Sequence, residues 1–255
     1  MATPAVDILM YHSVSDRGGA TSIHPRVFAG QMRAISEAGV DVISLDDYLA
    51  AKAGQKTLAK RSVVVTFDDG FQDFAEVAWP EMRSHGFLPI VYLPTGFVGG
   101  AEGWRGIATP PRPLMGWDTA RALAGQGVEF GSHTVTHPDL NGLTDSDLDA
   151  ELTQSRALIE ARLGCPVRHF APPYGIARPK IRARISKVYA TSVGTRLGSA
   201  SLRSDAHDLP RIEMYYFTDL NRWRAQLDGR GGAYLATRQA MRGIKTAVMK
   251  PWRGV

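Results

Sequence analysis

The residues that constrain the fold most are 62–70, Ser-Val-Val-Val-Thr-Phe-Asp-Asp-Gly. Three consecutive valines predict a strand that is buried on both faces, as in parallel sheets. The strand ends in the adjacent carboxylates of Asp68 and Asp69, and Gly70 permits a tight turn. Because catalytic groups collect at the carboxyl ends of parallel strands, this pair is predicted to lie at the rim of a site. The alternative is an Asp-Gly turn that only caps the next helix.

Strand and helix patterns alternate along the rest of the chain. Strands are predicted at residues 7–14, 41–44, 62–67, 88–93, 128–133, 168–175 (running into a turn), 189–193 and 209–214. Helices are predicted at residues 25–38, from 44 onward, 71–83 with a break near Pro80, 117–124, 144–163 and 179–187. Seven or eight strands separated by helices favour a barrel over an open sheet. With 255 residues, 44% apolar and 22% charged, we expect one α/β domain.

The composition also bears on location. No apolar run approaches the roughly 20 residues of a membrane span. The N-terminal residues lack the cationic start and apolar run of a secretory signal, so we expect a cytoplasmic, or membrane-peripheral, protein. A single cysteine, Cys165, excludes an internal disulfide and a cysteine-based metal site.

The net charge of +5 is concentrated near the C-terminus. We therefore divide the chain into a barrel at residues 1–232 and a basic C-terminal helix and tail at 233–255. Residues 229–255 contain no acid and six basic residues, Arg230, Arg238, Arg242, Lys245, Lys250 and Arg253. Such a helix either meets anionic lipid or a phosphate-bearing substrate, or docks with a solvated basic face. Nucleic-acid binding is not expected, because basic residues elsewhere are interspersed with acids and no nucleic-acid motif occurs.

A metal site is predicted from side chains that follow different strands. His133 and His137, four residues apart, combine with Asp69 into a one-carboxylate, two-imidazole set that suits a catalytic divalent metal. The histidine spacing alone is weak evidence, because helix and loop surfaces produce it by chance. The position of all three residues at strand ends strengthens it. Asp68 is then placed to take a proton from a metal-activated water.

Three motifs in this order resemble those of the polysaccharide deacetylase family, which is carbohydrate esterase family 4. They are Thr-Phe-Asp-Asp-Gly at 66–70, His-Thr-Val-Thr-His at 133–137 and Phe-Ala-Pro-Pro-Tyr-Gly at 170–175. The resemblance implies a distorted (β/α)7-type barrel that removes N-acetyl groups from sugars. It implies that Asp68 is the catalytic base and that Asp69, His133 and His137 hold a divalent metal, Zn²⁺ before Co²⁺ or Ni²⁺.

The resemblance also bears on the substrate groove. It implies that Pro173 and Tyr174 line the groove, and that the backbone N–H of Tyr174 binds the oxyanion. Trp104 and Trp117 are candidates for stacking on a sugar ring, although Trp117 is as readily explained by packing.

The chain departs from the family pattern in two places. Ala171 stands where many members have an arginine that orients the base, and no late Leu-x-His motif supplies the usual acid. Residues 10–14 and 209–212 instead resemble the branch that includes biofilm poly-N-acetylglucosamine deacetylases, which makes His12 the expected acid. We hypothesise that Arg211 replaces the missing arginine.

The remaining histidines have weaker claims to a role. His207 is the rival acid, although we expect it in a solvent-exposed polar loop. His24, His85 and His169 have no partner motif and are interpreted as structural.

The expected function is therefore metal-dependent removal of an N-acetyl group from an amino sugar. We expect a nucleotide- or lipid-linked intermediate, or an oligosaccharide, of surface-glycan synthesis as the substrate. Two alternatives stay open: a deformylase that acts on a lipid-linked amino sugar, and a catalytically silent glycan-binding barrel.

Overall fold

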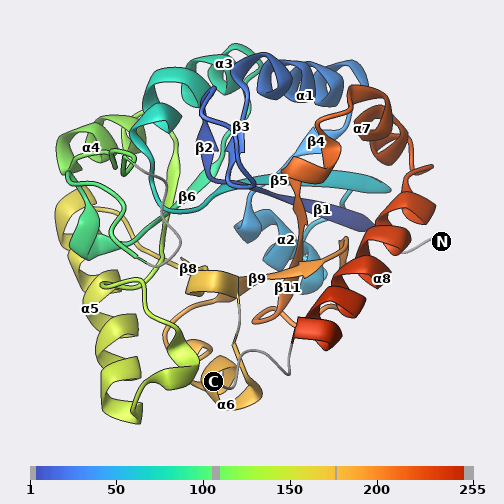
Figure 1. Cartoon of the computed structure of the whole chain (residues 1–255). Helices are drawn as coiled ribbons and strands as arrows, with labels where there is room; N and C mark the ends of the chain where they lie inside the picture. Colours follow the sequence, from blue (N-terminus) through green and yellow to red (C-terminus); the bar gives the residue numbers. More distant parts are fainter. Residues whose placement is uncertain (1–3, 105–109, 176, 250–255) are drawn as a thin grey trace.

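Seven parallel strands close into a barrel in the computed structural model, which describes residues 4–104, 110–175 and 177–249. The ring order is β1–β11–β9–β8–β7–β6–β5, and β1 closes it by pairing with both β5 and β11. The distorted (β/α)7-type barrel predicted from the sequence is confirmed (Figure 1). The barrel strands are β1 (Ala5–Tyr11), β5 (Arg61–Phe67), β6 (Ile90–Leu93), β7 (Glu129–Ser132), β8 (His169–Phe170), β9 (Thr191–Leu197) and β11 (Leu209–Glu213).

Four strands of two residues each extend this framework. β4 (Asp41–Val42) pairs with β5, and β10 (Ala200–Ser201) runs antiparallel to β1. β2 (Ser13–Val14) and β3 (Ser22–Ile23) form a separate parallel pair directly after β1. β4 was predicted, and β2 lies within the single strand predicted at residues 7–14, which is interrupted at His12. β3 and β10 were not predicted.

Most helices lie outside the ring of strands (Figure 1). They are α1 (Pro25–Glu37), α3 (Trp79–Ser84), α4 (Trp117–Ala124), α5 (Asp145–Leu163), α6 (Pro179–Ile185), α7 (Leu220–Leu227) and α8 (Gly232–Met249). The helix predicted at 71–83 is a π-helical turn, Phe74–Ala78, followed by α3, and α7 was not predicted. Short 3₁₀ turns occur at Thr95–Phe97, Leu140–Gly142, Pro173–Gly175 and Met214–Phe217.

The helix α2 (Leu45–Lys52) has a different place, behind the ring in Figure 1. Its Leu45 and Tyr48 are fully buried in a cluster with alternate strand residues such as Ile8 and Val64. The intervening strand residues, such as Val63, pack in a second cluster with the outer helices. Since successive strand side chains alternate between faces, α2 closes the inside of the barrel at its amino end and leaves the carboxyl end open.

The C-terminal helix α8 docks on the barrel. Tyr234 Oη donates a hydrogen bond to the Tyr216 carbonyl (2.7 Å), and Gln239 Nε2 donates to the Leu197 carbonyl (2.7 Å). Arg238 lies over the Tyr216 ring at 4.9 Å. The predicted basic residues Lys250 and Arg253, and the side chain of Lys245, lie outside the described part. Within the described residues, no helix is both long and apolar enough to cross a bilayer.

Candidate active site

A pocket of about 280 Å³ opens at the carboxyl end of the barrel. It is lined by side chains that follow or end different strands. His12 follows β1, Asp68 and Asp69 follow β5, and His133 and His137 follow β7. The structure therefore brings together five residues that the sequence singled out.

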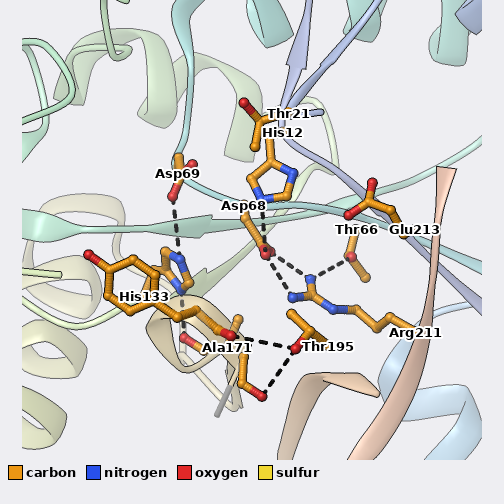
Figure 2. Close-up of polar contacts among 12 residues, drawn as sticks. His12, Thr21, Thr66, Asp68, Asp69, His133, Ala171, Thr195, Arg211 and Glu213 are labelled. Atoms are coloured by element: carbon orange, nitrogen blue, oxygen red, sulfur yellow. Dashed lines mark hydrogen bonds and ion pairs between the residues drawn. The ribbon is translucent and has the colours of Figure 1, made fainter. Parts of the chain in front are cut away.

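The three predicted metal ligands converge on one point. Nε2 of His133 and Nε2 of His137 each lie 3.4 Å from Asp69 Oδ1, and all three side chains are buried. His133 Nδ1 donates a hydrogen bond to the Ala171 carbonyl (2.6 Å; Figure 2). This bond leaves the lone pair of His133 on Nε2, where a metal ion would need it.

These residues fit a divalent metal. At 3.4 Å neither imidazole is aligned to donate a hydrogen bond, so Asp69 Oδ1 has no such partner among the described residues. Ligands about 2.0–2.2 Å from a tetrahedral ion are themselves about 3.3–3.6 Å apart, which agrees with the observed spacing. Burial alone would raise the pKa of Asp69, but His133, His137 and His12 hold it well below the usual range. The carboxylate is thus available as an anionic ligand.

The two histidines differ in their protonation behaviour. Burial alone would lower the pKa of both rings. Contacts with Asp69 and Asp68 outweigh burial at His133 and raise its pKa, whereas at His137 burial and the neighbouring His133 keep the pKa below its ordinary value.

Asp68 is held by a buried arginine. Arg211 Nη1 donates to Asp68 Oδ1 and Arg211 Nη2 donates to Asp68 Oδ2, both at 2.7 Å (Figure 2). Arg211 also donates to the Gly194 carbonyl (2.9 Å) and to Thr66 Oγ1 (3.1 Å). Burial alone would raise the pKa of Asp68, but the Arg211 charge and its hydrogen bonds keep that pKa below the ordinary value. Asp68 is therefore an oriented carboxylate that can accept a proton.

The two candidate acids are separated by the fold. His12 Nε2 lies 3.9 Å from Asp68 Oδ2, and its side chain is 16% exposed in the pocket. His207 lines a different hollow beside α6 and donates from Nε2 to the Tyr189 carbonyl (3.0 Å). It is partly buried rather than solvent-exposed. Of these two histidines, His12 is the one placed to act on a substrate.

The backbone of the site is locally strained. Among the described residues other than glycine, positive φ occurs at Asp69 (71°), Thr134 (71°), His137 (55°) and Tyr174 (60°). Such conformations cost on the order of 1–3 kcal/mol each and persist where the surrounding structure imposes them. All four lie at or between the candidate site residues, so the strain is concentrated at the pocket.

Glu151 of α5 braces the loop that carries both histidines. Its carboxylate accepts hydrogen bonds from the backbone N–H groups of Val135 (2.6 Å) and Thr136 (3.0 Å). Thr134 Oγ1 accepts a further bond from the His137 N–H (3.1 Å). These bonds fix the turn that aims His137 at Asp69.

Of the residues predicted to contact the sugar, two line the pocket and two do not. The Trp104 ring stacks on His137 with centroids 4.2 Å apart, and the Tyr174 ring meets the same imidazole edge-to-face at 5.1 Å. Both aromatic residues line the pocket. Pro173 is buried within the turn and does not line the pocket. For Trp117 the structure corrects our expectation, because this side chain packs against the outer core with Arg162 over its ring and does not line the pocket.

Several lining residues escaped the sequence analysis. Glu213 follows Arg211 by two positions on β11, so strand alternation could have indicated it. Burial raises the pKa of Glu213 above its ordinary value. Arg242 was noted only as one of the basic residues near the C-terminus, and the structure places it at the pocket, which it reaches from α8. The other unpredicted lining residues are Met10, Thr21, Glu102, Arg112, Gly175 and Thr195.

Comparison with known proteins identifies related deacetylases. A chitooligosaccharide deacetylase of Bradyrhizobium sp. (strain ANU 289) is 30% identical over 137 residues, which cover 52% of this chain and 55% of that enzyme. The chain thus spans about half the length of this relative.

Two solved structures share the fold. The deacetylase PplD of Streptococcus pyogenes, in complex with acetate, matches with a TM-score of 0.72 and 24% identity over 82% of this chain and 92% of that chain. IcaB from Ammonifex degensii matches with a TM-score of 0.70 and 21% identity over 87% of this chain and 97% of that chain. The polysaccharide deacetylase family model matches residues 55–193, which is more than half of the chain and includes Asp68, Asp69, His133 and His137. The chain belongs to the polysaccharide deacetylase family.

Proposed function

We propose that the protein is a metal-dependent hydrolase that removes the N-acetyl group from an amino sugar. The observation that carries the proposal is the placement of the Arg211-held Asp68 carboxylate beside the Asp69, His133 and His137 cluster in one pocket. Family membership supports the same reaction class.

Asp69, His133 and His137 would hold the divalent ion, with Zn²⁺ preferred and Co²⁺ or Ni²⁺ as alternatives. When bound, such an ion polarises the amide carbonyl and acidifies water. Asp68 accepts the proton of the attacking water, and Arg211 keeps both carboxylate oxygens oriented.

Two further groups complete the reaction. The Tyr174 backbone N–H donates to the oxyanion that develops on the former carbonyl oxygen. His12 donates a proton to the departing nitrogen as the C–N bond breaks. The products are acetate and the free amino sugar.

The proposed substrate is an N-acetylated sugar carried on a nucleotide or a polyprenyl phosphate, or a short oligosaccharide, on the cytoplasmic side of the membrane. Arg242 lines the pocket and brings a positive charge to it from the basic helix α8, which suits a phosphate-bearing substrate. The same helix would contact anionic lipid.

The test is acetate release from free, nucleotide-linked and lipid-linked N-acetyl sugars, using metal-loaded protein beside Asp68→Asn and, as a matched control, His207→Gln. We expect release by the wild type and the control and its loss in Asp68→Asn. If the protein releases formate from an N-formyl analogue but no acetate from any N-acetyl sugar, the acyl group in the proposal would be formyl instead of acetyl. Sugar binding without release of acid or amine would indicate a binding protein instead.

A further inference from the structure

A second polar cluster lies at the closed, amino end of the barrel, opposite the pocket. Glu129 is the first residue of β7, His169 is the first residue of β8, and Asp46 lies in the first turn of α2. The fold thus brings together residues 46, 129 and 169 at the point where α2 meets the barrel. None of the three belongs to the pocket described above.

The atoms of these three side chains that could bind a metal ion face one another. His169 Nε2 lies 3.1 Å from Glu129 Oε1 and 3.4 Å from Asp46 Oδ1. All three candidate donor atoms lie within 4.8 Å of one another. The His169 side chain is fully buried, whereas the Asp46 and Glu129 side chains are 45% and 33% exposed. One buried imidazole and two partly exposed carboxylates therefore face one another.

The hydrogen bonding of this cluster is incomplete. His169 Nε2 and Asp46 Oδ1 are both buried and have no hydrogen-bond partner among the described residues. Arg168 contacts Asp46, but through the other oxygen, Oδ2, at 3.2 Å. The charge of Arg168 is therefore not placed between the imidazole and the carboxylates.

Neither neutral form of His169 suits these surroundings. His169 Nδ1 lies 2.8 Å from Thr191 Oγ1. If Nδ1 donates to Thr191, the lone pair of Nε2 faces two carboxylate oxygens. If Thr191 donates instead, the N–H at Nε2 has no aligned acceptor, since neither nearby oxygen meets hydrogen-bond geometry. The two carboxylates are balanced either by a proton on Nε2 or by a cation bound between the imidazole nitrogen and the two carboxylate oxygens, and a bound cation would also satisfy the unpartnered atoms.

We propose that Asp46, Glu129 and His169 bind a second divalent ion of the Zn²⁺ class. Nitrogen and oxygen ligands in this number suit zinc, with the open position taken by water from the exposed side. Because Asp46 belongs to α2 and the other two ligands to strands, the ion would tie the helix that closes the barrel to its wall. Its role is structural, and it is independent of the proposed reaction.

Counting metal tests the proposal without relying on activity. Zinc-loaded wild type is compared by elemental analysis with a His133→Ala/His137→Ala variant, which lacks two ligands of the first site. We expect two ions per chain in the wild type, one in the double variant and none after Asp46→Asn is added. Asp145→Asn, an exposed acid in the first turn of α5, is the matched control and should leave the count unchanged.

Thermal unfolding of the same proteins gives a second, independent readout. Zinc should raise the Tm of the double variant by several degrees, since an ion that binds only the folded chain stabilises it. Asp46→Asn should abolish that rise, and Asp145→Asn should not. A single ion in the wild type with none in the double variant would overturn the proposal and leave a protonated His169 as the balancing charge. A zinc effect that survives Asp46→Asn would also overturn it.

Discussion

The Arg211 guanidinium and the Asp68 carboxylate form two parallel hydrogen bonds of 2.7 Å across the inside of the barrel, although 143 residues separate them in the chain. Paired hydrogen bonds of this kind fix the plane of the carboxylate as well as its position. Arg211 thus contacts the carboxylate that the arginine at the position of Ala171 is expected to orient in many family members. Its role in orienting the base stays a prediction.

Arg211→Lys should lower kcat, because a single ammonium cannot hold both oxygens and a misplaced base costs on the order of 10²-fold. Arg211→Ala should also lower the free energy of unfolding by about 3–5 kcal/mol, since it leaves a buried carboxylate unpaired. Steady-state kinetics, urea unfolding and metal analysis measure these effects. Unchanged kcat in folded Arg211→Lys would remove the proposed role.

His12→Gln should lower kcat by about 10²–10⁴-fold without loss of metal, because the variant retains the shape of the pocket and loses the proton donor. His207→Gln is the matched control, and its kcat should stay at the wild-type value because His207 lies beside α6. Kinetics with the best substrate of the panel provide the measurement. A kcat loss in the control, with His12→Gln active, would reverse the assignment.

Trp104→Ala should raise KM, because it removes the ring that stacks on His137 and forms part of the pocket wall. Trp117→Ala should lower Tm through lost packing and leave KM unchanged. Measuring KM and Tm for both variants separates a wall residue from a packing residue. Equal KM values for the two variants would contradict the assignment.

Glu213→Gln should change how stability depends on pH. Burial raises the pKa of Glu213 above its ordinary value of 4.5, while His12 and Arg211 oppose the shift. Between those two pKa values the folded chain binds more protons than the unfolded chain, so the Glu213 contribution to stability falls as pH rises. The variant lacks this loss, so its stability relative to wild type should increase as the pH rises above about 4.5.

Urea unfolding of both proteins in EDTA checks this prediction, because the chelator removes any contribution from metal release at low pH. If the difference in unfolding free energy between variant and wild type does not change as the pH is raised past 4.5, Glu213 has the same pKa in the folded and the unfolded chain, and the prediction is wrong.

Local chemistry explains which elements could be predicted. Thr144 caps α5 by accepting a hydrogen bond from the Asp147 N–H, and Gly164 ends that helix with φ of 70°. Both signals are visible in the sequence, as is the valine run of β5. The strands β3 and β10 have two residues each and lie in polar segments without an apolar run, so tertiary pairing alone reveals them.

The candidate site likewise contains residues that short motifs indicate and residues that only the tertiary structure brings together. Asp68 and Asp69 are adjacent, and His133 and His137 share one loop, so short motifs indicate them. The choice of Trp104 over Trp117 depends on the stacking of Trp104 on His137, a contact between residues far apart in the chain that no local pattern specifies. The pairing of His169 with Asp46 also depends on the docking of α2.

The closure of the ring by β1 has a consequence for the order of synthesis. β1 is made first, yet its neighbour β11 carries Arg211 and emerges more than 200 residues later. Residues 55–193, the segment that matches the family model, contain neither His12 nor Arg211. During synthesis, Asp69, His133 and His137 therefore emerge before Arg211, the partner of Asp68. The pair of Asp68 and Arg211 can form only after β11 has been made.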